Sequence, residues 1–250
     1  MKKNDISAFV IAYNDSDSIG KVIDGLTSVL PEVADNYEII IVLYEGSNDG
    51  TERIVKERIA KDAHIRLVSQ PRDRKGYGVA LQLGISNSRY GLVFYTDGDN
   101  QYDAREIKLL LGKIEGADIV SGYRAKRRDP RMRLVTASVY NWLINRLFST
   151  NVRDVDSAFK IYRKEILDKI KIICQTGLAD AEILARARRH GARIVEVPIS
   201  HFERKTGKPV FEISALGKLG FVHPRVVRQL LREMLILKGD LHTERGCKDE

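Results

Sequence analysis

Continuous apolar runs alternate with amphipathic segments along the first half of the chain. Residues 6–13 (ISAFVIAY) and 37–44 (YEIIIVLY) are almost entirely apolar, which is typical of strands in a parallel sheet that is covered on both faces. Between these runs, apolar residues recur at helical spacing from Ile19 to Leu30, and Pro31 follows as a stop signal. The pattern therefore predicts a strand, a helix and a second strand in this order.

The same alternation continues to about residue 122. Further helices are predicted at Glu52–Ala60 and 76–88, and further strands at 64–70, 90–97 and 117–124. Strands that alternate with helices form a right-handed, doubly wound α/β layer with a mainly parallel sheet. We therefore expect an α/β fold of the Rossmann-like type.

The second half of the chain has a different character. A basic segment at 124–133 (RAKRRDPRMR) comes first, and the segments after it are an apolar helix at 134–148, a helix at 179–191 and a strand at 193–200. Apolar residues from Val226 to Leu235 then form a stripe at helical spacing. We expect one domain over 1–215, with a first half at 1–122 and a second half at 123–215, and an amphipathic helix with a polar tail over 216–250.

Composition adds a prediction about partners. The chain has a formal net charge of +8, which favours a polyanion such as nucleic acid, anionic lipid or a phosphorylated small molecule. No apolar run reaches the ~18 residues of a membrane span, and the polar start MKKNDIS does not resemble a signal peptide. We therefore expect a cytoplasmic protein, in which the distant Cys174 and Cys247 are reduced thiols without a function.

Several common enzyme classes lack their motifs in this chain. The turn after the first strand reads AYNDSDSIG, which is neither the glycine pattern of dinucleotide-binding folds nor a phosphate-binding P-loop. The chain also has no G-x-S-x-G and no H-E-x-x-H sequence, so α/β-hydrolases and zinc proteases of that type have no support.

The segment FYTDGDNQYD at 94–103 carries the main chemical signal. Asp97 and Asp99 are two residues apart at the end of an apolar strand, so in an extended chain their carboxylates point the same way. Together with the amide oxygen of Gln101 they form a candidate site for Mg²⁺ or Mn²⁺, which prefer oxygen ligands. A plain turn is the alternative, because Gly, Asn and Asp favour turns.

The order of four segments is more specific than any one of them. They resemble the family 2 glycosyltransferases of GT-A fold, and most closely the dolichol- and polyprenol-phosphate sugar synthases. The four segments are VIAYND, EGSNDGT, RKGYGVAL and TDGDNQYD, and the likeness continues through DIVSGYR, NVRDVDSAFKIYR and IVEVPISHFERKTGKP to about residue 210. The chain departs from the family pattern at Ile11, where a Pro is usual, and at Tyr44-Glu45, where an Asp pair is usual.

The resemblance implies a donor site for a nucleotide sugar and a divalent cation. The residues it assigns to the nucleotide sugar are Ala12, Tyr13, Asp15, Glu45, Lys75, Asp97 and Gly98, and those it assigns to the metal are Asp97, Asp99 and Gln101. Three of these have simpler alternatives: Tyr13 could fill the corner between strand and helix, Asp15 could cap the helix, and Lys75 could be an exposed, solvated lysine.

The resemblance also implies an acceptor site. Asp154 or Asp156 could deprotonate an acceptor hydroxyl, although an acceptor that is already a phosphate needs no base. The residues assigned to an acceptor phosphate are Arg124, Arg131, Arg133, Ser138, Arg204 and Lys208, and the arginines suit this role because their guanidinium binds phosphate with two hydrogen bonds. Glu182 matches a recurrent acid of the family, with a structural role as the alternative.

Taken together, these motifs predict an inverting, metal-dependent glycosyltransferase. The expected reaction moves a hexose, either mannose from GDP-mannose or glucose from UDP-glucose, to a polyprenyl or dolichyl phosphate. The protein would act peripherally at the cytoplasmic face of an anionic membrane, with or without a membrane-anchor partner and without nucleic acid. Three alternatives stay open: another lipid or saccharide acceptor, a basic nucleic-acid-binding module, and a non-catalytic family member, the last because of Tyr44-Glu45.

Overall fold

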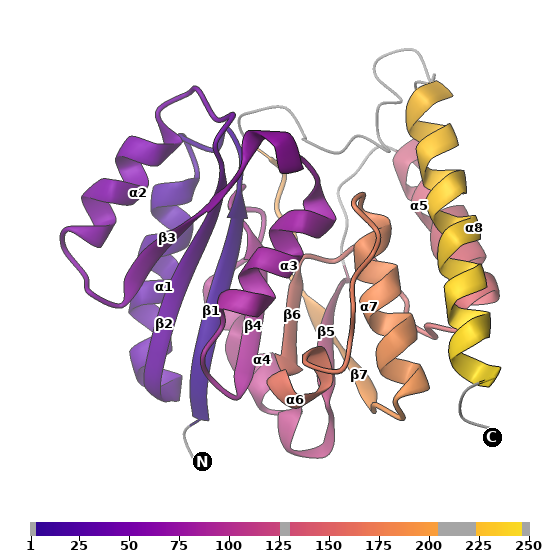
Figure 1. Ribbon diagram of the computed structural model, residues 1–250. Helices are drawn as coiled ribbons and strands as arrows, with labels where there is room; N and C mark the ends of the chain where they lie inside the picture. The colour runs from indigo at the N-terminus through magenta and orange to yellow at the C-terminus, as the bar shows by residue number, and fades with distance from the viewer. Residues whose placement is uncertain (1–3, 126–130, 205–223, 247–250) are drawn as a thin grey trace.

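The computed structural model describes residues 4–125, 131–204 and 224–246. Within these residues one seven-stranded sheet has the order β3-β2-β1-β4-β6-β5-β7 (Figure 1). Its strands are β1 Asn4–Ala12, β2 Ala34–Tyr44, β3 Ile65–Gln70, β4 Leu92–Asp97, β5 Ile119–Arg124, β6 Phe159–Arg163 and β7 Ile194–Ile199. Only β6 runs antiparallel to its neighbours in this sheet, pairing with β4 on one side and β5 on the other. The predicted mainly parallel α/β fold is confirmed.

Helices cover both faces of the sheet, as the apolar strands require. They are α1 Ile19–Val33, α2 Thr51–Ile59, α3 Tyr77–Asn87, α4 Ile107–Leu111, α5 Arg131–Phe148, α6 Lys164–Leu167, α7 Leu178–Arg189 and α8 Pro224–Gly246. Side chains of α1, α2 and α4 belong to the core on one face, and side chains of α3, α5, α7 and α8 to the core on the other. Alternate residues of β1 serve the two cores: Ala8 and Val10 point to one, Phe9 to the other.

Three details differ from the pattern in the sequence. Helix α1 continues to Val33 and so includes Pro31, which has no N–H to donate to the carbonyl four residues before it, and the helix ends two residues later. Helix α5 begins at Arg131, inside the basic segment at 124–133 and before the predicted helix start at residue 134, since Arg is a good helix former. The short helix α4 was not predicted, because its five residues are fewer than the periodicity needs.

Glycine allows one close contact in the core. A Cβ placed on Gly84 of α3 would lie 2.3 Å from the ring of Phe9 on β1. Any larger residue at this position would therefore push α3 away from the sheet. Tight packing here matters for the site, because α3 follows directly after the loop that carries Lys75.

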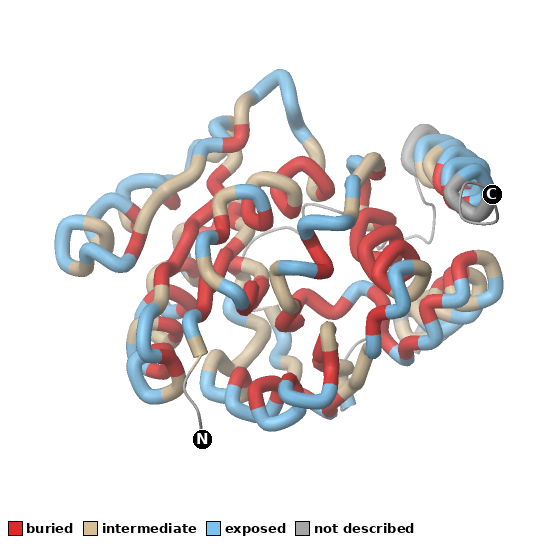
Figure 2. Tube along the Cα trace, turned by 60° about the horizontal axis from the view of Figure 1, so that its bottom comes forward, coloured by how far each residue is buried: buried red, intermediate tan, exposed pale blue. Residues whose placement is uncertain are grey.

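Helix α8 lies beside α5 and α7 at one end of the molecule (Figure 1). Its Met234, Leu237 and Leu241 are buried in the core, whereas Leu231 and Leu235 are exposed. Figure 2 shows this contrast between a mostly exposed C-terminal helix and the buried strands. Among the residues that the structure describes, no helix is both long enough and apolar enough to cross a membrane.

Candidate active site

The loops that follow β1, β2 and β4 meet at one edge of the sheet, because the three strands are parallel. Asn14, after β1, adopts a left-handed backbone conformation with φ 51°, which Asn tolerates better than most residues. Its backbone N–H donates to Ser47 Oγ, and its side-chain oxygen accepts from the backbone N–H of Asn48. These two bonds tie the loop after β1 to the loop after β2.

Two aromatic rings and a lysine gather at this edge. The rings of Tyr13 and Tyr44 meet edge to face with centroids 5.5 Å apart, and Lys75 Nζ lies 5.8 Å and 5.7 Å from their centroids. The structure thus brings together two residues predicted for the nucleotide sugar, Tyr13 and Lys75, and adds Tyr44. Ala12 is buried at the end of β1, and Glu45 is exposed in the next loop.

Asp15 does not cap helix α1. The cap position is Ser18, which makes no side-chain capping bond, so the capping alternative is wrong. Instead, the Asp15 carboxylate accepts from the backbone N–H of Tyr13 at 3.0 Å and from Arg204 Nη2 at 2.8 Å. Burial raises the pKa of Asp15 to about 6, although the Tyr13 N–H and the Arg204 charge act in the opposite direction.

Asp97 and Asp99 stand at the end of β4, where negative charge accumulates. Burial raises the pKa of Asp97 well above its usual range, and the carboxylates of Asp99, Asp180 and Asp15 add to this effect. Burial also raises the pKa of Asp99, against the favourable charge of Arg204. The positive charge of Arg204 therefore faces several carboxylates at this edge.

The residues around the two carboxylates hold the β4 loop in a fixed shape. The Gly98 N–H donates to the Ile11 carbonyl at 2.8 Å, and Ser18 Oγ donates to the Gly98 carbonyl at 2.8 Å. The backbone N–H of Gln101 donates to Asp99, while its side-chain nitrogen donates to the carbonyl of Phe202. The predicted ligand Gln101 thus lies in the same loop, and its amide nitrogen is directed at the chain near Arg204.

This donor set fits a divalent cation. A cation between Asp97 and Asp99 would stabilise their charged forms, which burial disfavours, and would relieve the repulsion that Asp99 exerts on Asp97. Mg²⁺ or Mn²⁺ can complete their coordination with water and phosphate oxygens. In the described part of the chain, no group of three or more His, Cys, Asp or Glu side chains could enclose a metal.

Arg204 lies on the donor side of the site. It bonds to Asp15, and its Nη1 lies 3.7 Å from Asp99 Oδ2. The sequence assigned Arg204 to the acceptor phosphate, and this assignment stays a prediction. Its contacts in the structure are with Asp15 and Asp99, which the sequence predicted for the nucleotide sugar and the metal.

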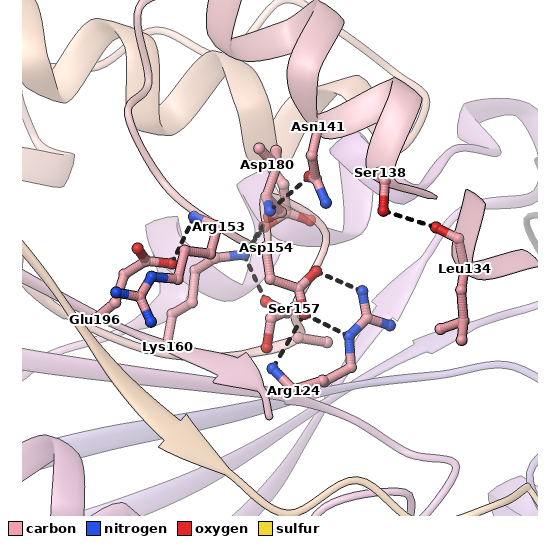
Figure 3. A network of polar contacts seen from close by, with 12 residues as sticks. Arg124, Leu134, Ser138, Asn141, Arg153, Asp154, Ser157, Lys160, Asp180 and Glu196 are labelled. Atoms are coloured by element: carbon pink, nitrogen blue, oxygen red, sulfur yellow. Dashed lines mark hydrogen bonds and ion pairs between the residues drawn. The ribbon is translucent and has the colours of Figure 1, made fainter. Parts of the chain in front are cut away.

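On the acceptor side, Arg124 and Asp154 form a two-pronged ion pair. Arg124 Nε and Nη2 each donate to one Asp154 oxygen at 2.6 Å, and the Arg124 backbone N–H donates to the same carboxylate at 3.2 Å (Figure 3). Both side chains are nearly buried. Asp154 therefore has its carboxylate bound by Arg124, which supports a positioning role more than that of a free base.

Asp156 is the more accessible of the two candidate bases. It is an exposed residue, yet crowding by protein atoms, together with the charge of Asp180, raises its pKa to about 7. Next to it, the Arg153 guanidinium stacks 4.9 Å from the ring centroid of Tyr123 on β5. A carboxyl group that titrates near neutral pH can take or give a proton at working pH.

Three of the remaining predicted acceptor residues, Arg131, Arg133 and Ser138, belong to α5. Ser138 is exposed on this helix, and its hydroxyl donates to the Leu134 carbonyl at 2.9 Å. Arg131 and Arg133 belong to the first turn of α5, but their side chains lie outside the described residues, as does Lys208 entirely. The structure therefore does not test whether these three cations join Arg124.

Sequence reasoning missed a buried ion pair under the acceptor loop. Lys160 on β6 donates to Asp180 on α7 at 2.6 Å, and both side chains are almost fully buried. The signal was present, because Lys160 interrupts the apolar run AFKIY. By contrast, Glu182 accepts from the Cys174 N–H and from Arg186 Nε, so its buried carboxylate has the structural role that was the alternative reading.

Comparison with known proteins places this geometry in context. The family model described as glycosyl transferase family 2 matches residues 7–171. A curated relative, undecaprenyl-phosphate 4-deoxy-4-formamido-L-arabinose transferase of Aeromonas hydrophila, is 25% identical over 216 residues, which is 86% of this chain. The chain spans 65% of the length of that relative.

Solved structures share the fold. Glucosyl-3-phosphoglycerate synthase from Mycobacterium tuberculosis, in complex with Mn²⁺, uridine diphosphate and phosphoglyceric acid, superposes with a TM-score of 0.68 at 22% identity, covering 92% of this chain and 78% of that one. The complex of the same enzyme with Mn²⁺, UDP-glucose and glycerol 3-phosphate gives a TM-score of 0.64 at 22% identity, covering 92% and 79%. These likenesses support the fold assignment independently of the family model.

Proposed function

The chain belongs to glycosyl transferase family 2, and from this premise we propose that it transfers a hexose from a nucleotide sugar to a polyprenyl phosphate with the help of a divalent cation. Mannose is our first choice of sugar and glucose our second. Inversion at the anomeric carbon is part of the proposal. The observation that carries it is the gathering of Asp97, Asp99 and Asp15 at the strand edge beside Tyr13 and Lys75.

The donor side supports the metal and the nucleotide. Tyr13 and Tyr44 offer ring faces to a nucleobase, and Asp97 and Asp99 would hold the cation. When bound, such a cation neutralises the charge of the leaving nucleoside diphosphate. The M. tuberculosis enzyme of the same fold binds Mn²⁺ together with uridine diphosphate, which agrees with this arrangement.

The acceptor side supports a phosphate. The curated relative is named for transfer to undecaprenyl phosphate, and Arg124 lies at the end of β5 close to Asp154. A lipid phosphate carries its own nucleophilic oxygen, so Arg124 needs only to orient it and Asp154 to orient Arg124. Asp156 stays available for an acceptor that must lose a proton.

The C-terminal helix supports a membrane location. Leu231, Leu235 and Ile236 are exposed on α8, whereas Glu233 accepts a hydrogen bond from Thr176 and the exposed Asp240 is paired with Arg186. Arg228 and Arg232 are exposed on the same helix and add positive charge beside the apolar residues. An apolar stripe beside basic residues suits an anionic membrane surface, and we place the enzyme at its cytoplasmic face.

A transfer assay with paired donors and acceptors tests the proposal. Purified protein with Mn²⁺ receives GDP-mannose or UDP-glucose, and either a polyprenyl phosphate in anionic vesicles or phosphoglyceric acid. We expect a glycolipid product with one donor, loss of this product in EDTA, and no product from phosphoglyceric acid. Transfer only to the soluble acid would reject the lipid acceptor, and hydrolysis or transfer unaffected by EDTA would reject the metal.

A further inference from the structure

The loop of residues 153–157, which we call the acceptor loop, is held from several elements (Figure 3). On its outer side, Asn141 of α5 accepts from the Val155 N–H at 3.1 Å, and Glu196 of β7 accepts from the Arg153 N–H at 2.8 Å. Arg124 of β5 holds the Asp154 carboxylate. The candidate catalytic side chains are therefore presented by a loop whose backbone is fixed at several points.

Lys160 holds the same loop from below. Its ammonium group donates to the Val155 carbonyl at 2.9 Å and to the Ser157 carbonyl at 2.5 Å, and its third hydrogen bond goes to Asp180. An ammonium group has three N–H donors, so these contacts use all of them. The two carbonyls flank Asp156, and one of them follows Asp154 directly. The positions of Asp154 and Asp156 thus depend in part on the buried charge of Lys160.

We propose that Lys160 is a positioning residue for the acceptor, which acts through the shape of the acceptor loop and touches no substrate. The proposal rests on the proposed transfer to a phosphate acceptor. Asp180 has the supporting role, since it neutralises Lys160 and also receives a hydrogen bond from Tyr95 at 3.4 Å.

A purely structural reading of the pair makes a different prediction. A buried ion pair contributes little net stability, and replacing both partners with apolar residues of similar volume is often neutral or stabilising. If Lys160 and Asp180 serve only the core, their joint replacement should leave catalysis unchanged. If Lys160 shapes the loop, the same replacement should impair the acceptor step even in a stable protein.

The main experiment uses the double variant Lys160→Met/Asp180→Leu in the full chain. We expect kcat with polyprenyl phosphate to fall by roughly 10- to 100-fold, the scale at which small misplacements of reacting groups affect rates. The KM for the nucleotide sugar and the thermal shift produced by Mn²⁺ with the nucleoside diphosphate should stay within about twofold, the level of ordinary surface changes. Tyr95→Phe is the matched control, because it removes a hydrogen bond to the same Asp180 and leaves both loop carbonyls bound.

Several outcomes decide the matter. Normal transfer by the double variant overturns the proposal, and so does an equal loss of donor and acceptor constants, which indicates general loosening of the fold. Should the double variant not fold, Asn141→Ala removes the bond to Val155 from outside the core: an acceptor-specific defect supports loop positioning, and unchanged acceptor constants overturn it. Absence of transfer by the unaltered protein would instead refute the proposed function, so the two failures are distinguishable.

Discussion

The two sides of the candidate site handle charge in opposite ways. At the donor edge, burial raises the pKa values of Asp97, Asp99 and Asp15, and the Asp99 carboxylate adds to the rise at Asp97 and Asp15, whereas the charge of Arg204 acts in the opposite direction on all three. In the acceptor loop, each central charge already has a partner: Arg124 binds Asp154, and Lys160 binds Asp180.

The difference shows what each side requires from its substrate. A bound cation stabilises the charged forms of carboxylates that repel one another, so the charges of the donor edge suit the proposed binding of a metal and its nucleotide. In the acceptor loop the charges are already paired, so the side chains are held in fixed positions before the substrate binds. The donor edge should therefore be sensitive to charge, and the acceptor loop to shape.

The largest expected effect comes from substitutions of the two carboxylates at the donor edge. Asp97→Asn or Asp99→Asn should lower transfer by roughly 10²-fold or more, because the cation loses a charged ligand where the leaving group develops charge. Thermal stability without metal should stay the same or rise, since the substitution removes a source of repulsion. Activity measured across Mn²⁺ concentrations and thermal shift provide the two readouts.

Asp103→Asn is the control for this prediction. Asp103 lies in the same loop, but its carboxylate pairs with the exposed Arg105 outside the cluster. Activity of this variant should match that of the unaltered protein. If the Asp97 and Asp99 variants respond to Mn²⁺ as the unaltered protein does, these carboxylates do not hold the metal.

The second prediction separates the two sides by replacing one arginine at a time with alanine. Arg204→Ala should raise the KM for the nucleotide sugar, since Arg204 contacts Asp15 and approaches Asp99. Arg124→Ala should raise the KM for polyprenyl phosphate and also destabilise the fold by about 3–5 kcal/mol, because it leaves the buried Asp154 without its partner. Initial rates with each substrate varied in turn, and unfolding in urea, measure both.

The Arg204→Ala variant also decides whether Arg204 belongs to the acceptor phosphate or to the donor side. The sequence motifs place Arg204 with the acceptor phosphate, together with Arg124. A rise only in the acceptor KM of Arg204→Ala would uphold that assignment and contradict the donor-side role that its contacts favour.

Sequence patterns predicted the strands well and the partners of charged residues poorly. Continuous apolar runs such as that of β1 report burial on both faces, which is a local property. The direction of a strand is not local, and nothing in the run AFKIY indicates that β6 is antiparallel to its neighbours. The predicted candidate residues Asp97 and Asp99 required only the strand end to be known.

The pairing of Arg204 with Asp15 could not be predicted for a related reason. The two residues are 189 positions apart, and their contact depends on the chain after β7 reaching back to the loop after β1. Similarly, the contacts of Lys160 could not be predicted, because its partners come from α7 and from the loop before β6. Motif order identifies which loops carry chemistry, and tertiary structure decides which charges meet.

The smallest expected effect is a pH-dependent change in stability caused by Asp156. The raised pKa of Asp156, about 7, means that the folded protein keeps a proton which the unfolded chain releases near pH 4. This contribution to stability is present below about pH 4 and is lost as the pH rises through 7. Asp156→Asn cannot titrate and should gain stability relative to the unaltered protein between pH 5 and 8, by at most ~1 kcal/mol because solvent screens this exposed residue.

Urea unfolding at several pH values measures the difference between the two proteins. Asp168→Asn is the control, because Asp168 is an exposed carboxylate paired with Lys164 on the surface. A stability difference that stays constant over this pH range would show that Asp156 titrates like an ordinary surface acid, and would remove it from the candidate bases.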